Sequence, residues 1–105
     1  MPYSPLSYLN VTVVLTDVSN AYSMQETDDV IVVNLGTPGA IQINLVASPV
    51  SGKELYVKDG AGNANTYNIT VAPAAGDIDG ATTQLINTAY GHLHLVYNGT
   101  QWNLL

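Results

Sequence analysis

The feature that most strongly limits how this chain can fold is its short runs of β-branched residues. Gly, Pro, Asn or Thr soon interrupts each run. The clearest are residues 11–15 (VTVVL), 30–34 (VIVVN) and 41–45 (IQINL). In the third run, apolar and amide side chains alternate, which is the two-residue period of a strand with one buried face. No run shows the 3.6-residue period of an amphipathic helix. The sequence therefore predicts an all-β protein.

Further strands are predicted along the rest of the chain. They lie at residues 54–58, 68–71, 84–86, 92–97 and 101–105. Asn98-Gly99 is a dipeptide typical of two-residue hairpin turns, and Trp102, in the last run, is expected to close the core. No repeat of solenoid period is visible. About eight short strands at this spacing are typical of an antiparallel β-sandwich or a jelly-roll-like barrel, which is the fold we expect.

The length of 105 residues, or 11.1 kDa, suits one domain, and we expect a single β-sandwich domain over residues 11–105. Residues 1–10 contain two prolines and are interpreted as an N-terminal arm, with a frayed terminus as the alternative. Tyrosine combines a large apolar surface with a polar tip, which suits interfaces. The predicted partner contacts of this arm are Tyr3, Leu6 and Tyr8.

Charged residues are scarce. They make up 10% of the chain, against about 25% in a typical soluble domain, and the net charge is −6 with only Lys53 and Lys58 positive. Two lysines are too few to displace the counterions of nucleic acid or to bind an anionic membrane, so neither is an expected partner. Because a lone monomer normally keeps a charged surface, we expect copies of the chain or a larger assembly to cover part of it.

From residue 28 to residue 104, the order of several loose motifs resembles a module found in virion proteins of tailed bacteriophages. The motifs are GKELYVKDGAGNA (residues 52–64), ITV (69–71), GDIDG (76–80) and YNGTQW (97–102). Modules of this kind occur as small capsid decoration or cement proteins and at the ends of tail fibres and spikes. The resemblance implies a β-rich fold and a homotrimer.

The resemblance leaves two functions open, and chain length favours one. A tail fibre needs a shaft and an attachment domain, for which 105 residues beginning at Met leave no room. We therefore expect a trimeric cement protein on the capsid surface of the virion, made in the host cytoplasm, whose partners are itself and the major capsid protein. The alternative is a receptor-binding module of a tail fibre or spike that binds host-surface polysaccharide.

His92 and His94 occupy alternate positions of a predicted strand, so both side chains point to the same face. Across a threefold axis, such pairs would supply six imidazoles to one metal ion, and the resemblance implies sites of this kind in some trimeric fibres and spikes. Within one chain, two histidines are too few for a metal site. The alternative is a polar strand face opposite Leu93 and Leu95, and no cofactor is expected.

The segment DGAGNAN, residues 59–65, places oxygen ligands at alternate positions, like a loose calcium loop. It lacks the terminal acid that gives such loops affinity, so a Gly-rich turn is the preferred interpretation. The chain has no cysteine, and no serine lies in a nucleophile motif such as Gly-x-Ser-x-Gly. No catalytic residue is therefore assigned, and the protein is not expected to be an enzyme.

Overall fold

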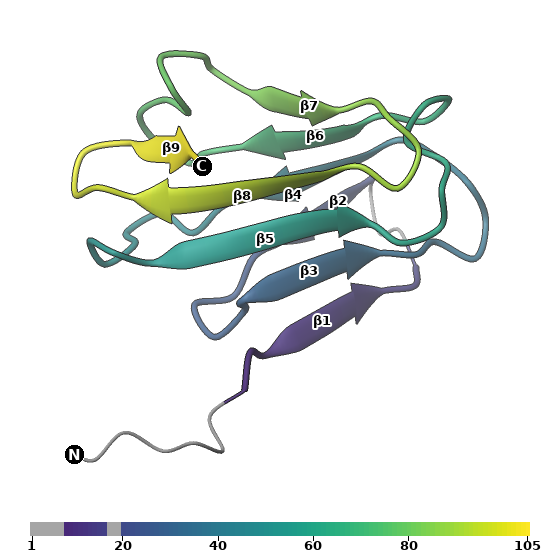
Figure 1. Ribbon diagram of the computed structural model, residues 1–105, viewed down its shortest axis with the longest axis horizontal. Helices are drawn as coiled ribbons and strands as arrows, with labels where there is room; N and C mark the ends of the chain where they lie inside the picture. The colour runs from purple at the N-terminus through teal and green to yellow at the C-terminus, as the bar shows by residue number, and fades with distance from the viewer. Residues whose placement is uncertain (1–7, 17–19) are drawn as a thin grey trace.

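The computed structural model describes residues 8–16 and 20–105. In these residues the protein is all-β, as predicted, with nine strands and no helix (Figure 1). The strands are β1 (Val11–Val14), β2 (Ala21–Ser23), β3 (Val30–Val33), β4 (Ile41–Asn44), β5 (Glu54–Asp59), β6 (Ile69–Ala72), β7 (Gln84–Ile86), β8 (His92–Tyr97) and β9 (Trp102–Leu104). The sequence did not predict β2, which is short and contains no β-branched residue.

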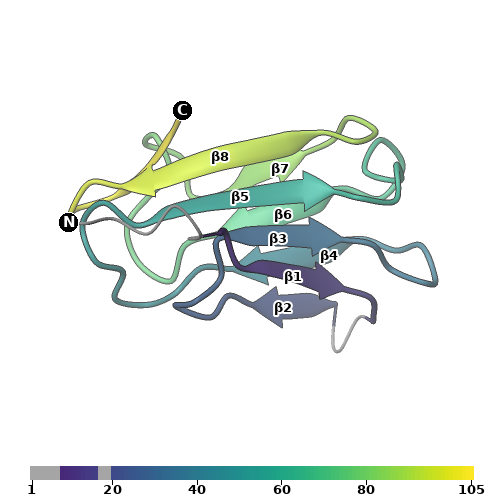
Figure 2. The ribbon, with the colours of Figure 1, turned by 60° about the horizontal axis from the view of Figure 1, so that its bottom comes forward.

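The strands form two sheets with the core between them. Sheet A has the order β1-β3-β5-β8-β9, and sheet B has the order β2-β4-β6-β7. From β1 to β6, successive strands belong to alternate sheets, so the chain winds around the core (Figure 2). The last three strands complete the sheets, β7 in sheet B and then β8 and β9 in sheet A.

Strand direction differs from the prediction. Within sheet A, β1, β3 and β5 run parallel, and within sheet B, β2, β4 and β6 do the same. In the described residues, the antiparallel pairs are β5–β8, β8–β9 and β6–β7. The expected antiparallel arrangement is therefore wrong for the first six strands. The reason is that a chain that crosses to the opposite sheet and returns lays its next strand parallel to the earlier one.

This winding resembles a short solenoid, although no repeat is visible in the sequence. Val11 pairs with Val30, and Val30 pairs with Tyr56, so two successive turns of the winding differ in length. Because the connecting loops are unequal, equivalent strand positions recur at unequal intervals. A search of the sequence for a fixed period therefore finds nothing.

Inward side chains of both sheets form one hydrophobic core. The predicted alternation of the third run is confirmed, since Ile41 and Ile43 are 3% and 0% exposed while Gln42 faces solvent. Trp102 is 1% exposed and meets the ring of Tyr97 edge-on at 5.4 Å, which confirms that it closes the core. Full burial of one aliphatic side chain contributes roughly 1.5–3 kcal/mol, so this core is the main source of stability.

The last hairpin joins β8 to β9 as predicted, but its turn is centred on Gly99 and Thr100, which the hydrogen bond from the Asn98 N–H to the Gln101 carbonyl encloses at 3.0 Å. Tyr97 pairs with Trp102, which leaves four residues in the loop. The side-chain carbonyl of Asn98 accepts hydrogen bonds from the backbone N–H groups of Thr100 and Gln101, at 2.8 and 3.0 Å. This side-chain-capped turn takes the place of the tight Asn-Gly turn.

Candidate functional site

The outer face of sheet A carries a row of exposed apolar side chains along β1 and its flanks. We call this row the apolar stripe; its members are Leu9, Val11, Val13 and Leu15. Each is between 48% and 59% exposed. Because successive side chains of a strand point to opposite faces, these odd-numbered residues project outward, whereas Val14 is buried in the core. β1 therefore carries apolar side chains on both of its faces.

The apolar surface continues from β1 across the neighbouring strands. The parallel register aligns Val11 with Val30 and then with Tyr56 on the outer face. In the next row it aligns Val13 with Val32. The side chains on β3 and β5 are half-buried, so an apolar band runs from the edge of sheet A to its middle.

The outer face of sheet B is mainly polar, unlike the apolar outer face of sheet A. Gln42, Asn44 and Thr70 lie on it, on β4 and β6. The amide of Gln42 donates a hydrogen bond to the side-chain carbonyl of Asn44 at 2.6 Å. Leu85 of β7 is an exposed apolar residue on this face, at 46%. Sheet B thus presents mainly amide and hydroxyl groups that bind water well, and sheet A presents apolar area.

β1 is also an edge strand. It pairs with β3 on one side, and no strand in the described part of the chain covers its other side. Its residues, VTVV, include neither a charge nor a proline, features by which natural edge strands usually avoid pairing with other chains. A strand with an open edge and an apolar outer face is suited to contact another protein.

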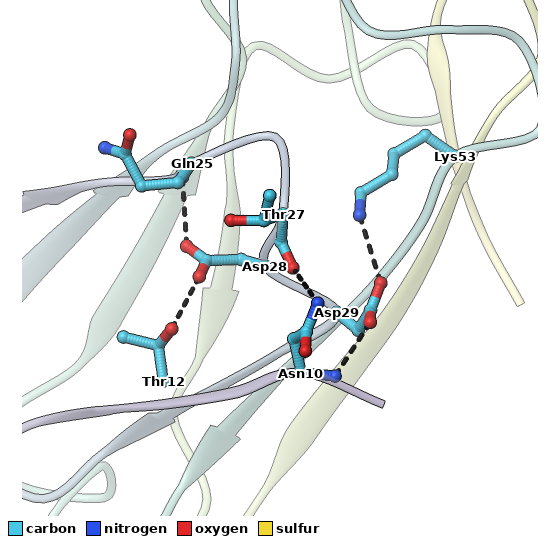
Figure 3. Close-up of polar contacts among 7 residues, drawn as sticks. All are labelled: Asn10, Thr12, Gln25, Thr27, Asp28, Asp29 and Lys53. Carbon is cyan, nitrogen blue, oxygen red and sulfur yellow. Dashed lines mark hydrogen bonds and ion pairs between the residues drawn. The ribbon is translucent and has the colours of Figure 1, made fainter. Parts of the chain in front are cut away.

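A buried carboxylate fixes β1 against β2. Asp28 is 4% exposed and accepts hydrogen bonds from the hydroxyl groups of Thr12 on β1 and Tyr22 on β2, at 2.5 and 2.7 Å. The backbone N–H of Gln25 donates to the same carboxylate at 2.9 Å (Figure 3). Burial first, and then the hydrogen bond to Asp28 and its negative charge, raise the pKa of the Tyr22 hydroxyl. The Asp28 carboxylate therefore holds the edge strand β1 in place. If it were removed, the hydroxyls of Thr12 and Tyr22 would lose their hydrogen-bond acceptor.

A second carboxylate anchors the start of β1. Asp29 accepts a hydrogen bond from the backbone N–H of Asn10 at 2.8 Å and lies 3.2 Å from the ammonium of Lys53 (Figure 3). The side-chain amide of Asn10 donates to the backbone carbonyl of Thr27 at 3.0 Å. The hydrogen bond from Asn10, helped by the Lys53 charge, outweighs partial burial and lowers the pKa of Asp29. Asn10 was predicted to belong to the N-terminal arm, but these contacts bind it to the domain.

A shallow hollow of about 390 Å³ interrupts the outer face of sheet A. Its lining consists of Leu9, Val30, Tyr56, Lys58 and His92. The antiparallel pairing of β5 with β8 places Lys58 directly opposite His92. The hollow is therefore apolar toward β1 and β3 and carries two basic side chains toward β5 and β8.

The two lysines of the chain have different partners. Lys53 forms an ion pair with Asp29. Lys58 has no carboxylate within ion-pair distance among the described residues. Its ammonium donates to the backbone carbonyl of Tyr90 and lies 5.7 Å from the centre of the Tyr90 ring. The rim of the hollow thus carries a positive charge that no carboxylate neutralises there, in a chain of net charge −6.

His92 and His94 lie on the outer face of β8, opposite the inward leucines of the same strand. The ring of His94 stacks on Tyr56 with 3.9 Å between centroids, and its Nε2 is 2.8 Å from a carboxylate oxygen of Glu54. Within residues 8–16 and 20–105, no three His, Asp or Glu side chains are grouped to hold a metal ion. A metal site shared between copies of the chain stays a prediction, and the metal would compete with Glu54 for His94.

Asp59 organises the loop that follows β5. Its carboxylate is 2% exposed and accepts four backbone hydrogen bonds. The donors are Ala61, Gly62, Ala64 and Tyr90, at 3.2, 3.1, 2.9 and 3.0 Å. Burial by itself raises the pKa of Asp59, but these hydrogen bonds outweigh it and lower the pKa from its ordinary value. Because both oxygens are engaged by the loop itself, the geometry agrees with the Gly-rich turn preferred from the sequence.

Of the three predicted contact residues of the N-terminal arm, the structure describes only one. Tyr8 is 80% exposed and precedes the apolar stripe, whereas Tyr3 and Leu6 lie outside the described residues. The stripe was not among the predicted contact residues, although its signal is present in LNVTVVL, residues 9–15. The segment is apolar at alternate positions and also at Val14, so a strand there has two apolar faces, and only one of them can face the core.

Comparison of the sequence with models of protein families and with curated proteins finds no match in either set. Among the residues that the structure describes, no helix has the length and apolarity that a membrane crossing requires. The arrangement of the outer face of sheet A is therefore the feature from which a function can be argued.

Proposed function

We propose that this chain is a structural, non-enzymatic protein of a bacteriophage virion, which assembles as a homotrimer and decorates the capsid as a cement protein. The observation that carries the proposal is the apolar stripe on the open edge strand of sheet A. An exposed apolar surface of this kind is unfavourable in water unless another protein covers it. The resemblance of residues 28–104 to phage virion modules suggests the class of that protein, a capsid subunit.

Burial of the apolar stripe contributes a modest binding free energy for each copy of the chain. Complete burial of a Val or Leu side chain contributes roughly 1.5–3 kcal/mol, so burying the exposed half of four such side chains contributes about 4 kcal/mol before ordering costs. A trimer presents three stripes, and simultaneous binding then strengthens attachment by roughly 10²–10⁴-fold without new contacts. In this arrangement the outer face of sheet A lies against the shell, and the amide-rich face of sheet B faces solvent.

The test is co-sedimentation of the purified chain with bare capsids of the parent virus and, in parallel, with cells of its host. The variant V11T/V13T keeps the β-branched shape of the stripe and removes apolar area. Leu85→Thr is the matched control, because Leu85 is 46% exposed on sheet B and Val13 is 48% exposed on sheet A. We expect the wild type and the control to bind capsids, and V11T/V13T to bind at least about tenfold more weakly.

Three results would contradict the proposal. Equal capsid binding by V11T/V13T and the wild type would show that the stripe is not the contact. Binding to host cells but not to capsids would instead support the receptor-binding module of a tail fibre. A chain that sediments as a monomer at working concentrations and ignores capsids would remove both the trimer and the attachment.

A further inference from the structure

We infer that the hollow on the outer face of sheet A binds a carboxylate of a partner protein, presented on an extended segment beside an apolar side chain. The inference rests on the proposed function, since it names the chemistry of the partner at the same surface. Its central observation is Lys58, which stands at the rim of an apolar hollow without a carboxylate partner in the described residues.

Strand geometry explains why the charge at this rim is uncompensated. Asp59 follows Lys58 directly, but alternation turns its side chain to the inner face, where four backbone N–H groups engage it. Glu54, on the outer face of the same strand, contacts His94. Asp29 is paired with Lys53. Each carboxylate near this part of sheet A is thus either turned away from the hollow or already bonded.

The ammonium of Lys58 is also held in position with donors to spare. A lysine ammonium has three N–H groups, and one of them donates to the Tyr90 carbonyl. The Tyr90 ring lies beside the ammonium, at 5.7 Å from its centroid. His92, opposite Lys58 across the strand pair, adds a second polar group on the same rim. The other two N–H groups of the ammonium remain to bind a carboxylate that enters the hollow.

The overall charge of −6 does not prevent this contact. At physiological ionic strength, charges more than about 8 Å apart in solvent are largely screened, so the field at the rim is set by Lys58 and its immediate neighbours. The same overall charge disfavours nucleic acid and anionic membrane as partners. A small free anion would leave the apolar side of the hollow uncovered.

An extended protein segment matches the remaining features. The hollow lies on the outer face of sheet A over β3, β5 and β8, and its apolar side is formed by Leu9 and Val30. An extended segment that crosses this face would turn alternate side chains toward the hollow and toward solvent. A carboxylate two residues away from an apolar side chain on such a segment points to the same side and fits the two halves of the hollow.

The probe is a pair of short peptides added to the full-length protein and followed by amide NMR spectra. One is N-acetyl-Val-Thr-Asp-Thr-Val-amide, in which the acid and both valines point to the same side of the extended chain, and the other has Asn in place of the acid. We expect the amide signals of Val30, Tyr56, Lys58 and His92 to shift with the acidic peptide. Its affinity should be at least about fivefold higher than that of the neutral peptide in dilute buffer, and the two should converge at about 0.5 M salt.

Two lysine variants give the matched comparison. Lys58→Met keeps the aliphatic stem and removes the charge, so it should abolish the preference for the acidic peptide while retaining weak binding of the neutral one. Lys53→Met removes a lysine already paired with Asp29 and should keep the preference. Thermal melts of both variants establish that each is folded.

The outcomes separate this inference from the proposed function. No shifts at millimolar peptide, equal binding of the two peptides, or a preference that survives Lys58→Met would overturn the inference, whatever the capsids do. Peptide binding as expected with no capsid binding would support the hollow and refute the cement function. If Lys58→Met alters self-association in sedimentation and leaves peptide binding unchanged, the occupant is a second copy of the chain, and the inference is wrong.

Discussion

Replacing Asp59 by Asn tests whether its buried carboxylate stabilises the loop after β5 and joins that loop to the backbone of Tyr90. Asn has the shape of Asp but carries an amide nitrogen in place of one oxygen, so it accepts hydrogen bonds through a single atom. One carboxylate oxygen of Asp59 accepts from Ala61 and Gly62, and the other accepts from Ala64 and Tyr90. Whichever way the amide turns, its NH₂ group therefore faces two backbone donors.

The expected loss of unfolding free energy follows from those two backbone donors. A buried donor left without an acceptor costs about 1–3 kcal/mol. The amide is expected to keep the shorter contacts, those to Ala64 and Tyr90 at 2.9 and 3.0 Å, and to abandon Ala61 and Gly62, which are partly accessible to water. We therefore expect Asp59→Asn to lower the free energy of unfolding by about 2–4 kcal/mol at neutral pH.

Urea unfolding followed by Trp fluorescence measures this loss, because Trp102 is the single Trp of the chain and is buried. Asp79→Asn is the control, since Asp79 is exposed and its carboxylate accepts from the Asn103 amide at 3.0 Å. The control should change the free energy of unfolding by no more than about 0.5 kcal/mol.

The pH dependence has a definite sign. The pKa of Asp59 is lower in the folded protein than its ordinary value of 3.8, so its contribution to stability is complete above that value. The contribution is lost as the pH falls through the lowered, folded-state pKa. The difference between the wild type and Asp59→Asn should therefore stay constant from about pH 5 to pH 8 and shrink in strong acid. A loss below about 0.5 kcal/mol at pH 7, or a difference undiminished in strong acid, would show that the Asp59 carboxylate does not stabilise the fold through these hydrogen bonds.

Three further predictions use the same unfolding measurement. Gly62→Ala should cost about 1–3 kcal/mol, because Gly62 has a φ of 81° and an added Cβ would lie 2.6 Å from the Tyr90 ring; an unchanged midpoint would contradict this. Leu95→Ala should cost about 2–5 kcal/mol, because Leu95 is 0% exposed, and a cost under about 1 kcal/mol would mean that the core is not packed as described. Lys53→Met should cost no more than about 1 kcal/mol, because its ion pair with Asp29 is partly exposed. That cost should fall as salt is added, and a rise would contradict the assignment.

Local sequence pattern located most of the strands and part of the core. Of the nine strands in the described residues, eight overlap runs predicted from β-branched content and alternation, which are properties of neighbouring residues. The inward face of residues 41–45 and the burial of Trp102 were predicted in the same way, since a two-residue period assigns faces without knowledge of the partner strand. β2 was missed because Ala21–Ser23 has little strand preference of its own and is defined by its pairing with β4.

Tertiary structure alone decided strand direction and the character of the surface. A turn that reverses the chain within one sheet and a turn that crosses to the other sheet contain the same residue types, so parallel pairing of β1, β3 and β5 has no local signal. VTVVL is apolar on both faces, and only its place at the edge of sheet A determines that Val11 and Val13 are exposed. The different environments of Lys53 and Lys58 depend on residues distant in sequence, Asp29 and Tyr90. Periodicity is a short-range property that assigns side chains to faces, whereas pairing and charge compensation depend on which distant segments the fold brings together.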